Sequence, residues 1–210
     1  MRLVRRKPGR RKRRPGCLGG LLRFFIFLAV VVTAGILVSR GYFNSDMAEK
    51  IKKTQYPIKY EHFVEKYSEE YKLDKYLVFA VIRTESRFDK YAVSRADAKG
   101  LMQLTDETGE ECAKKLGISR YTPDALFDPE INIQLGCYYL RRLLDNYDNV
   151  DTALAAYNGG PGNVDLWLKD KNYSDGFGNL TNIPFEETKK YVLRVRDAWG
   201  MYKNIYDKQE

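Results

Sequence analysis

The sequence predicts an all-α protein, and three observations support that fold class. Apolar residues recur at helical spacing along most of the chain after Pro57. Short steps of proline, glycine and aspartate separate these segments, as at 123–124, 128–129 and 158–162. No stretch alternates polar and apolar residues for long enough to form a sheet. We therefore expect residues 57–210 to fold as one helical domain.

The N-terminal segment differs in composition from the rest of the chain. Residues 1–40 contain 11 of the 36 basic residues and none of the 28 acidic residues. The remaining residues, 41–210, are slightly acidic, although the whole chain has a net charge of +8. A basic domain surface is therefore not predicted, and nucleic-acid binding by the domain loses its main support.

The same segment has the pattern of a membrane anchor. A basic tail at 1–20 precedes an uncharged run, FFIFLAVVVTAGILV, at 24–38. With its flanks the run extends over 21–43, and a bilayer crossing needs about 20 helical residues. Positive charge favours the cytoplasmic side, so we expect the tail inside the cell and residues 44–210 outside it.

Two other interpretations of the N-terminus remain open. A cleaved signal peptide has the same order of basic and apolar regions, but its small-residue site here, at 33–35, lies within the apolar run. A nucleic-acid-binding arm is the other alternative, because the basic residues are dense.

The helices of the body follow in order. A polar, partly helical linker is expected at 44–56, and a helix with one apolar stripe after Pro57, through Tyr71. Asp74 is a suitable N-cap for the segment KYLVFAVIRTES, whose interior is apolar on every side and which we expect at the centre of the domain. Residues 87–100 are irregular. Further helices are expected at about 106–116, 129–147, 150–157, 161–170 and 187–206.

One carboxyl group stands out on the central helix. Glu85 follows the apolar residues Val81 and Ile82 on one helix face, and no lysine or arginine lies three or four positions away. Loss of water should raise its pKa, and Asp89, if close, would raise that pKa further. A carboxyl that stays protonated near neutral pH can act as a general acid. The periodicity alone favours the alternative, a boundary glutamate that bends toward water.

Four short motifs favour a catalytic role for Glu85 over that of a boundary glutamate. They are ESRF at 85–88, GLMQL at 100–104, AYNGGPGNV at 156–164 and IPFEETKKYV at 183–192. In this order they resemble the lytic transglycosylases of the soluble-lytic-transglycosylase (SLT) type, which have a goose-lysozyme-like fold and cleave the glycan strands of bacterial peptidoglycan. The resemblance runs from about Leu73 to Tyr206. It implies an SLT-type catalytic domain at 57–210. Together with the expected transmembrane helix, it predicts a catalytic domain on the outer face of a bacterial cell membrane.

The resemblance also assigns residues to the site. It implies that Glu85 is the catalytic acid and base. The implied substrate-binding residues are Ser94, Gly100, Leu101, Met102, Gln103, Tyr139, Tyr157, Asn158, Glu187 and Tyr191. Amides suit N-acetyl groups and hydroxyls, and tyrosines offer a flat face to a sugar. The alternative for Leu101, Met102 and Tyr157 is a place in the core. Two positions depart from the family pattern, Asp106, which can still cap a helix there, and Gly159.

The implied reaction needs only one carboxyl group. Glu85 donates its proton to the glycosidic oxygen between N-acetylmuramic acid and N-acetylglucosamine, and then removes the proton from the muramoyl C6 hydroxyl. The C6 oxygen attacks C1, and a 1,6-anhydromuramoyl end forms. The alternatives are a hydrolytic muramidase on the same fold and a catalytically silent peptidoglycan-binding scaffold. The expected partners are glycan strands and the membrane, with no metal, organic cofactor or nucleic acid. Cys112 and Cys137 either form a disulfide or remain buried free thiols.

Overall fold

The computed structural model describes residues 17–42 and 45–207. The chain divides into two compact units, residues 1–50 and 51–210. Most of the predicted basic tail, 1–16, lies outside the described residues, as do Phe43 and Asn44, where the expected anchor ends and the expected linker begins.

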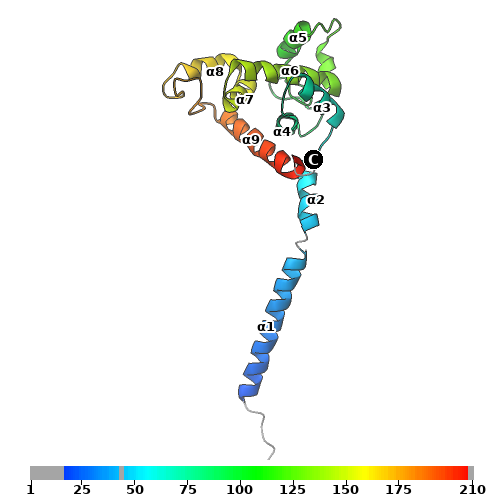
Figure 1. Ribbon diagram of the computed structural model, residues 1–210, viewed down its shortest axis with the longest axis vertical. Helices are drawn as coiled ribbons and strands as arrows, with labels where there is room; N and C mark the ends of the chain where they lie inside the picture. Colours follow the sequence, from blue (N-terminus) through cyan, green and yellow to red (C-terminus); the bar gives the residue numbers. More distant parts are fainter. Residues whose placement is uncertain (1–16, 43–44, 208–210) are drawn as a thin grey trace, which may run out of the picture. The chain divides into compact units, whose positions relative to one another are not determined.

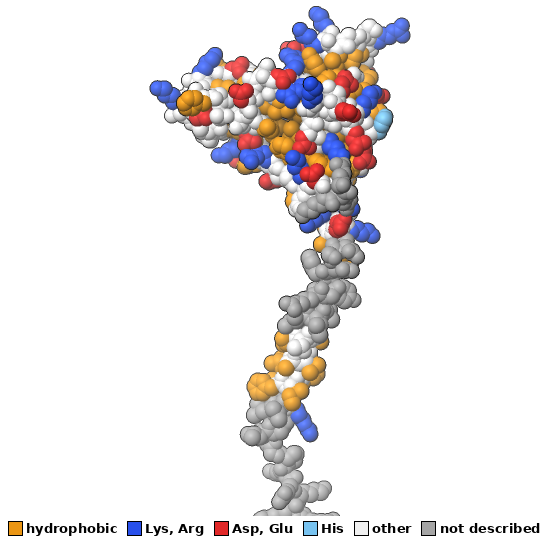
Figure 2. All heavy atoms as spheres, viewed as in Figure 1, with side chains coloured by type: hydrophobic (Ala, Val, Ile, Leu, Met, Phe, Trp, Pro, Cys, Tyr) orange, Lys and Arg blue, Asp and Glu red, His pale blue; other side chains and the backbone are white. Residues whose placement is uncertain are grey.

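The first unit contains helix α1 (Cys17–Tyr42) and the start of α2 (Ser45–Gln55). The large apolar side chains between Phe24 and Val32 are 46–67% exposed, and Figure 2 shows them as orange spheres on the described part of α1. Within residues 17–42 and 45–207, no helix is both long enough and apolar enough to cross a membrane.

The second unit is helical, as the sequence predicts (Figure 1). Its remaining elements are α3 (Glu61–Glu70), α4 (Lys75–Glu85), α5 (Asp106–Lys115), the 3₁₀ helix η1 (Pro123–Phe127), α6 (Pro129–Asn146), α7 (Val150–Gly159), α8 (Pro161–Leu168) and α9 (Glu186–Tyr206). The described part of the chain holds isolated β-bridges, such as Val93 with Lys99, and no strand. The predicted helices agree with the observed ones, whereas η1 was not predicted.

Helix α4 lies at the centre of this unit, and its residues 76–82 are all buried. It packs along α9 and against α3. Asp74 caps α4 as predicted, because its side chain accepts the N–H of Tyr76. The same carboxylate accepts Trp199 Nε1 and Lys203 Nζ, each at 2.9 Å. These contacts fix the start of α4 against the end of α9.

Two apolar cores build the domain. The larger core joins residues of α3, α4, α6, α7 and α9, and the smaller one joins α5, η1 and part of α6. Tyr139 and Tyr157 pack against both cores. Cys112 belongs to the smaller core and Cys137 to the larger one, and both are buried free thiols, the second of the two expected states.

Candidate active site

Glu85 is the last residue of α4, and its side chain keeps a partly exposed surface above the buried Val81 and Ile82. The chain leaves the helix abruptly here, since Arg87 (φ 52°) and Phe88 (φ 66°) adopt left-handed conformations. The carboxyl group therefore lies at the end of the central helix. The negative end of the helix dipole is found there, and it disfavours a second negative charge.

The surroundings of Glu85 keep its carboxyl protonated up to neutral pH. Burial raises its pKa to about 7, and the negative charge of Glu187 raises that pKa as well. The phenol of Tyr191 and the guanidinium of Arg194 act in the opposite direction, without cancelling the effect of burial.

The charges near Glu85 come from α9 rather than from its own helix. Glu187, Tyr191 and Arg194 are spaced by four and three residues, so they share one face of α9. The expected contribution of Asp89 is wrong. Helix α4 ends at Glu85, and Asp89 is exposed, with its carboxylate accepting the N–H of Tyr91 at 2.9 Å.

Three tyrosines form a connected group beside the acid. The rings of Tyr157 and Tyr191 stack with centroids 6.5 Å apart and an angle of 4°, and the rings of Tyr139 and Tyr157 lie 5.4 Å apart. Tyr157 Oη donates to the carbonyl oxygen of Met102 at 2.8 Å. Burial raises the pKa of Tyr157 and of Tyr191 well above 10, and the charge of Glu85 raises both further. Both phenols therefore stay protonated, and each has an O–H that can donate a hydrogen bond.

The phenol of Tyr191 is unusual among these groups. The residue is 2% exposed, and its Oη has no hydrogen-bond partner within the described part of the chain. A buried hydroxyl without a partner is costly, so such groups often have a functional role. The phenol lowers the pKa of Glu85, so it lies close to the carboxyl, although the two do not meet in a well-formed hydrogen bond.

Most residues of the GLMQ motif are buried beneath the site and do not line its surface. Leu101 and Met102 are fully buried in the larger core, so their side chains are not free to contact a substrate, contrary to our expectation. Gly100 is also buried, with φ +77°, and a Cβ there would overlap Leu126 O and the Asn132 amide. This glycine is required by packing against η1 and α6, not by the approach of a sugar to its backbone.

Asn132 is a positioning residue that the sequence analysis missed. It is fully buried on α6, where its Oδ1 accepts the N–H of Met102 at 2.7 Å. Its Nδ2 donates to Lys99 O at 3.0 Å and to Leu126 O at 2.8 Å. One side chain thus holds both sides of the GLMQ loop. The available signal was a polar residue within the apolar segment of α6, at a position that faces the core.

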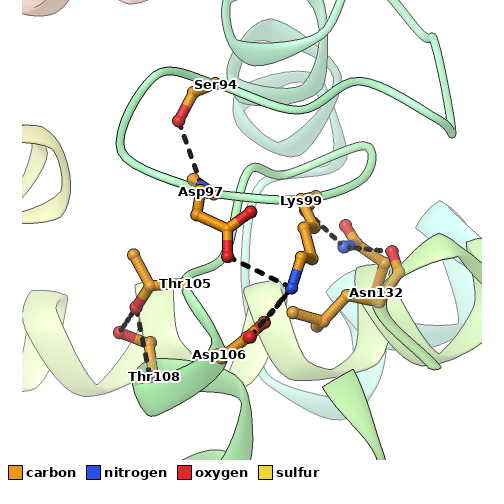
Figure 3. A network of polar contacts seen from close by, with 9 residues as sticks. Ser94, Asp97, Lys99, Thr105, Asp106, Thr108 and Asn132 are labelled. Atoms are coloured by element: carbon orange, nitrogen blue, oxygen red, sulfur yellow. Dashed lines mark hydrogen bonds and ion pairs between the residues drawn. The ribbon is translucent and has the colours of Figure 1, made fainter. Parts of the chain in front are cut away.

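The loop before this motif carries Ser94 and is fixed by its own hydrogen bonds (Figure 3). Ser94 is exposed, and its Oγ accepts the N–H groups of Ala96 and Ala98 at 3.2 and 3.1 Å. Gln103 Nε2 donates to Ala92 O and Gly100 O at 3.0 and 2.9 Å. The amide donors of Gln103 are therefore used within the loop, whereas the Ser94 hydroxyl keeps its proton available.

Lys99 connects this loop to α5. Its ammonium group lies 2.7 Å from Asp106 and 3.4 Å from Asp97 (Figure 3). The N-cap of α5 is Thr105, whose Oγ1 accepts the N–H of Thr108 at 3.2 Å. Asp106 was expected to cap this helix. It is instead the first helical residue, and its carboxylate pairs with Lys99.

The turn between α7 and α8 presents Asn158. This residue is partly exposed near the end of α7, directly after Tyr157. Gly160, with φ +85°, ends α7 and begins α8, which is a conformation that suits glycine. The structure thus brings Glu85 together with Tyr157, Tyr191 and Glu187, whereas Ser94 and Gln103 stand in the adjacent loop.

The described domain is helical, its central helix ends at Glu85, and it shares the lysozyme-like fold of solved SLT transglycosylases. The family model described as Transglycosylase SLT domain matches residues 62–177, more than half of the chain. The chain therefore belongs to the SLT transglycosylase family.

Curated relatives agree with this family. Membrane-bound lytic murein transglycosylase C of Yersinia pestis (strain Pestoides F) is 35% identical over 167 residues, which are 69% of this chain and 47% of the relative. The protein of the same name from Yersinia pseudotuberculosis gives the same values. The chain thus spans about half the length of the curated relatives it matches.

Solved structures share the fold. The 70-kDa soluble lytic transglycosylase of Escherichia coli aligns with a TM-score of 0.66 and 31% identity, over 73% of this chain and 25% of that one. A complex of the 70-kDa soluble lytic transglycosylase with bulgecin A gives 0.68 and 30%, over 76% and 26%. An inactive mutant of lytic transglycosylase Slt from Pseudomonas aeruginosa gives 0.65 and 31%, over 75% and 26%.

Proposed function

We propose that this protein is a membrane-anchored peptidoglycan lytic transglycosylase. It cleaves the β-1,4 bond between N-acetylmuramic acid and N-acetylglucosamine and leaves 1,6-anhydromuramoyl ends. The observation that carries this proposal is the carboxyl group of Glu85, which has a pKa of about 7 and faces the buried phenol of Tyr191. Family membership supports the reaction class.

The proposed reaction uses Glu85 twice. As an acid it donates its proton to the glycosidic oxygen, while the N-acetyl group of the muramoyl sugar stabilises C1. As a carboxylate it then accepts the proton of the C6 hydroxyl, whose oxygen bonds to C1. A group with a pKa near the working pH is suited to both steps. The carboxyl is protonated again at the end, and no water is consumed.

The neighbours of Glu85 have distinct parts in this scheme. Tyr191 donates a hydrogen bond to the carboxylate that exists between the two steps, which occupies the unpartnered Oη. Glu187 favours the protonated state before the first step, and Arg194 limits that effect. Tyr157 is held by Met102 O and supports the ring of Tyr191. Ser94, Gln103, Tyr139 and Asn158 are proposed to bind the sugars.

The proposed anchor rests on the sequence pattern and on α1. The uncharged run at 24–38 follows a strongly basic tail, and the large apolar side chains of α1 at 24–32 are exposed within its own unit. Exposed apolar surface of this kind needs a lipid or protein partner. We propose a single-pass topology in a bacterial cell membrane, with residues 1–20 in the cytoplasm and the catalytic domain outside.

The test is mass spectrometry of purified peptidoglycan digested by the full chain in detergent. We expect 1,6-anhydromuramoyl products from the natural sequence and none from Glu85→Gln, because the amide cannot donate or accept the required proton. Folding of the variant is checked by circular dichroism.

Two other results would change the assignment. Reducing-end products that depend on Glu85 would indicate a hydrolytic muramidase. In the other result, the full chain stays folded and binds glycan but releases no product under any solution condition tested. That result would indicate a catalytically silent scaffold.

A further inference from the structure

Helix α2 (Ser45–Gln55) carries a short apolar stripe that is largely exposed. Met47 and Ile51 are four residues apart and therefore share one face of the helix. Their side chains are 56% and 51% exposed. Neighbouring apolar side chains on one exposed helix face favour a contact with something outside the chain.

Charged residues are arranged around this stripe in a regular way. Lys50 and Lys52 directly precede and follow Ile51, so they lie about 100° to either side of it around the helix axis. Glu49 is two residues from both Met47 and Ile51 and therefore lies on the opposite face. Helices that lie in a membrane surface have this arrangement, because the stripe enters the acyl boundary while the lysines reach the lipid phosphates.

The connection to α1 keeps α2 near the end of the proposed anchor. Helix α1 ends at Tyr42 and α2 begins at Ser45, so only residues 43 and 44 lie between them. The three steps from Tyr42 to Ser45 span at most about 11 Å. With the proposed anchor in the bilayer, α2 therefore begins at the membrane surface, where an anionic headgroup layer is the nearest partner for its lysines.

The other end of α2 is fixed to the catalytic domain. Gln55 O accepts Arg83 Nε at 3.0 Å, and the Arg83 guanidinium lies 4.1 Å from the centroid of the Tyr56 ring. Tyr56 O accepts Tyr206 Oη at 2.8 Å. Residues of α4 and α9 thus hold the end of α2, and a restraint on α2 also restrains the domain.

We propose that α2 lies in the outer surface of the membrane, with Met47 and Ile51 in the acyl boundary and Lys50 and Lys52 on the phosphates of anionic lipids. The inference rests on the anchor in the proposed function. Two apolar side chains bind a bilayer only weakly, so α2 stays there because α1 keeps its local concentration high. The bound helix limits the catalytic domain to glycan next to the membrane.

The first test measures the depth of single spin labels on the full chain in nanodiscs of phosphatidylcholine and phosphatidylglycerol. Cys17→Ser removes one thiol, and the other two, Cys112 and Cys137, are buried. A nitroxide is attached at Met47→Cys, Ile51→Cys or Glu49→Cys, and the chain without an added cysteine gives the background. Power saturation compares access to oxygen, which enters the bilayer, with access to a water-soluble nickel chelate.

We expect the oxygen-to-nickel ratio to be at least about threefold higher at positions 47 and 51 than at 49, because the stripe enters the boundary by about 5–10 Å. Equal ratios at the three positions overturn the proposal. Low access to both reagents at 47 and 51 indicates a protein contact and overturns it as well.

A label on α1 separates this proposal from the anchor. Leu28 is 46% exposed, and Leu28→Cys should favour oxygen strongly if α1 is in the bilayer. A high ratio there with equal ratios on α2 refutes the seating of α2 alone. A label at Leu28 that is open to nickel refutes the anchor and the seating of α2 together, whereas the digestion of peptidoglycan still decides the reaction.

The second test concerns the lysines. The proportion of bound helices is taken from the two components of the spectrum of the Met47→Cys label. Lys52→Gln should lower the ratio of bound to free helices about fivefold with anionic lipid, the contribution of one lysine near a charged surface. With phosphatidylcholine alone, the same variant should leave the ratio unchanged. An equal effect in both lipids overturns the contact with anionic phosphates.

Discussion

Glu85 is a single ionisable group whose pKa depends on burial and on three side chains of another helix. Glu187 raises that pKa, while Tyr191 and Arg194 lower it. Because these contributions have opposite signs, substitutions of neighbouring residues should move the pH profile of the reaction in opposite directions.

The first prediction concerns that profile. The proposed general acid, Glu85, must be protonated to act, so activity should fall as pH rises through its pKa of about 7. Glu187→Gln removes a negative charge, lowers the pKa and moves this fall to lower pH. Arg194→Gln removes a positive charge and moves the fall to higher pH. Initial rates from pH 5 to pH 9 provide the measurement, and shifts in the same direction for both variants would contradict the assignment.

The second prediction concerns stability. Glu85 has a pKa of 4.5 in the unfolded chain and about 7 in the folded one. The folded state therefore binds the proton more tightly, and stability falls as pH rises between those two values. Glu85→Gln removes this effect. The free energy of unfolding of the variant minus that of the natural sequence should therefore be about 1–3 kcal/mol larger at pH 8 than at pH 4. Urea unfolding at both pH values is the measurement, and an equal difference at both would show that the carboxyl is not desolvated.

At the scale of elements, the GLMQ loop depends on its packing against α6 and η1. Gly100→Ala should cost at least 2 kcal/mol, because the new Cβ overlaps Leu126 O and the Asn132 amide. Gly117→Ala is a matched control, since Gly117 has φ +70° and no atom within 4 Å of an added Cβ. It should cost only about 1 kcal/mol for the left-handed conformation. Thermal unfolding of both variants separates packing from backbone strain, and equal losses would contradict the packing explanation.

Asn132 provides another test of the same loop. Asn132→Ala leaves the N–H of Met102 and the carbonyl groups of Lys99 and Leu126 without this partner, and should cost about 2–4 kcal/mol. Asn146→Ala, at the exposed end of α6, should change stability by less than about 0.5 kcal/mol. Chemical unfolding with guanidinium chloride measures both. A small loss at Asn132 would mean that the loop is held mainly by its apolar residues.

The helices could be predicted from the sequence, because each has a clear apolar pattern and a recognisable boundary. Asp74 capped α4 as expected, and the apolar interior of α4 correctly indicated a central position. Long-range contacts could be predicted only where the family resemblance supplied them, as for Glu187 and Tyr191 beside Glu85. The influence of Arg194 on Glu85, and the bonds of Asn132 to the GLMQ loop, join segments far apart in the sequence and were missed. Local periodicity carries no information about such contacts, which is why it suggested Asp89 instead.

At the scale of the whole molecule, the predicted anchor can be removed without touching the second unit, which begins at residue 51. A chain without residues 1–43 should appear in the soluble fraction, whereas the full chain should stay with membranes after alkaline carbonate extraction, because only the full chain carries the exposed apolar side chains of α1. Immunoblots of both fractions provide the measurement. A full chain found in the carbonate supernatant would contradict the anchor.

The partition of the site between α4 and α9 has a consequence for biosynthesis. Glu85 leaves the ribosome about 120 residues before α9 is complete, a delay of roughly 6–24 seconds at ordinary rates of synthesis. Until α9 docks, the carboxyl is hydrated and ionised at neutral pH, so it has no proton to give. For the proposed reaction, this means that a protonated general acid exists only after α9 has docked against α4.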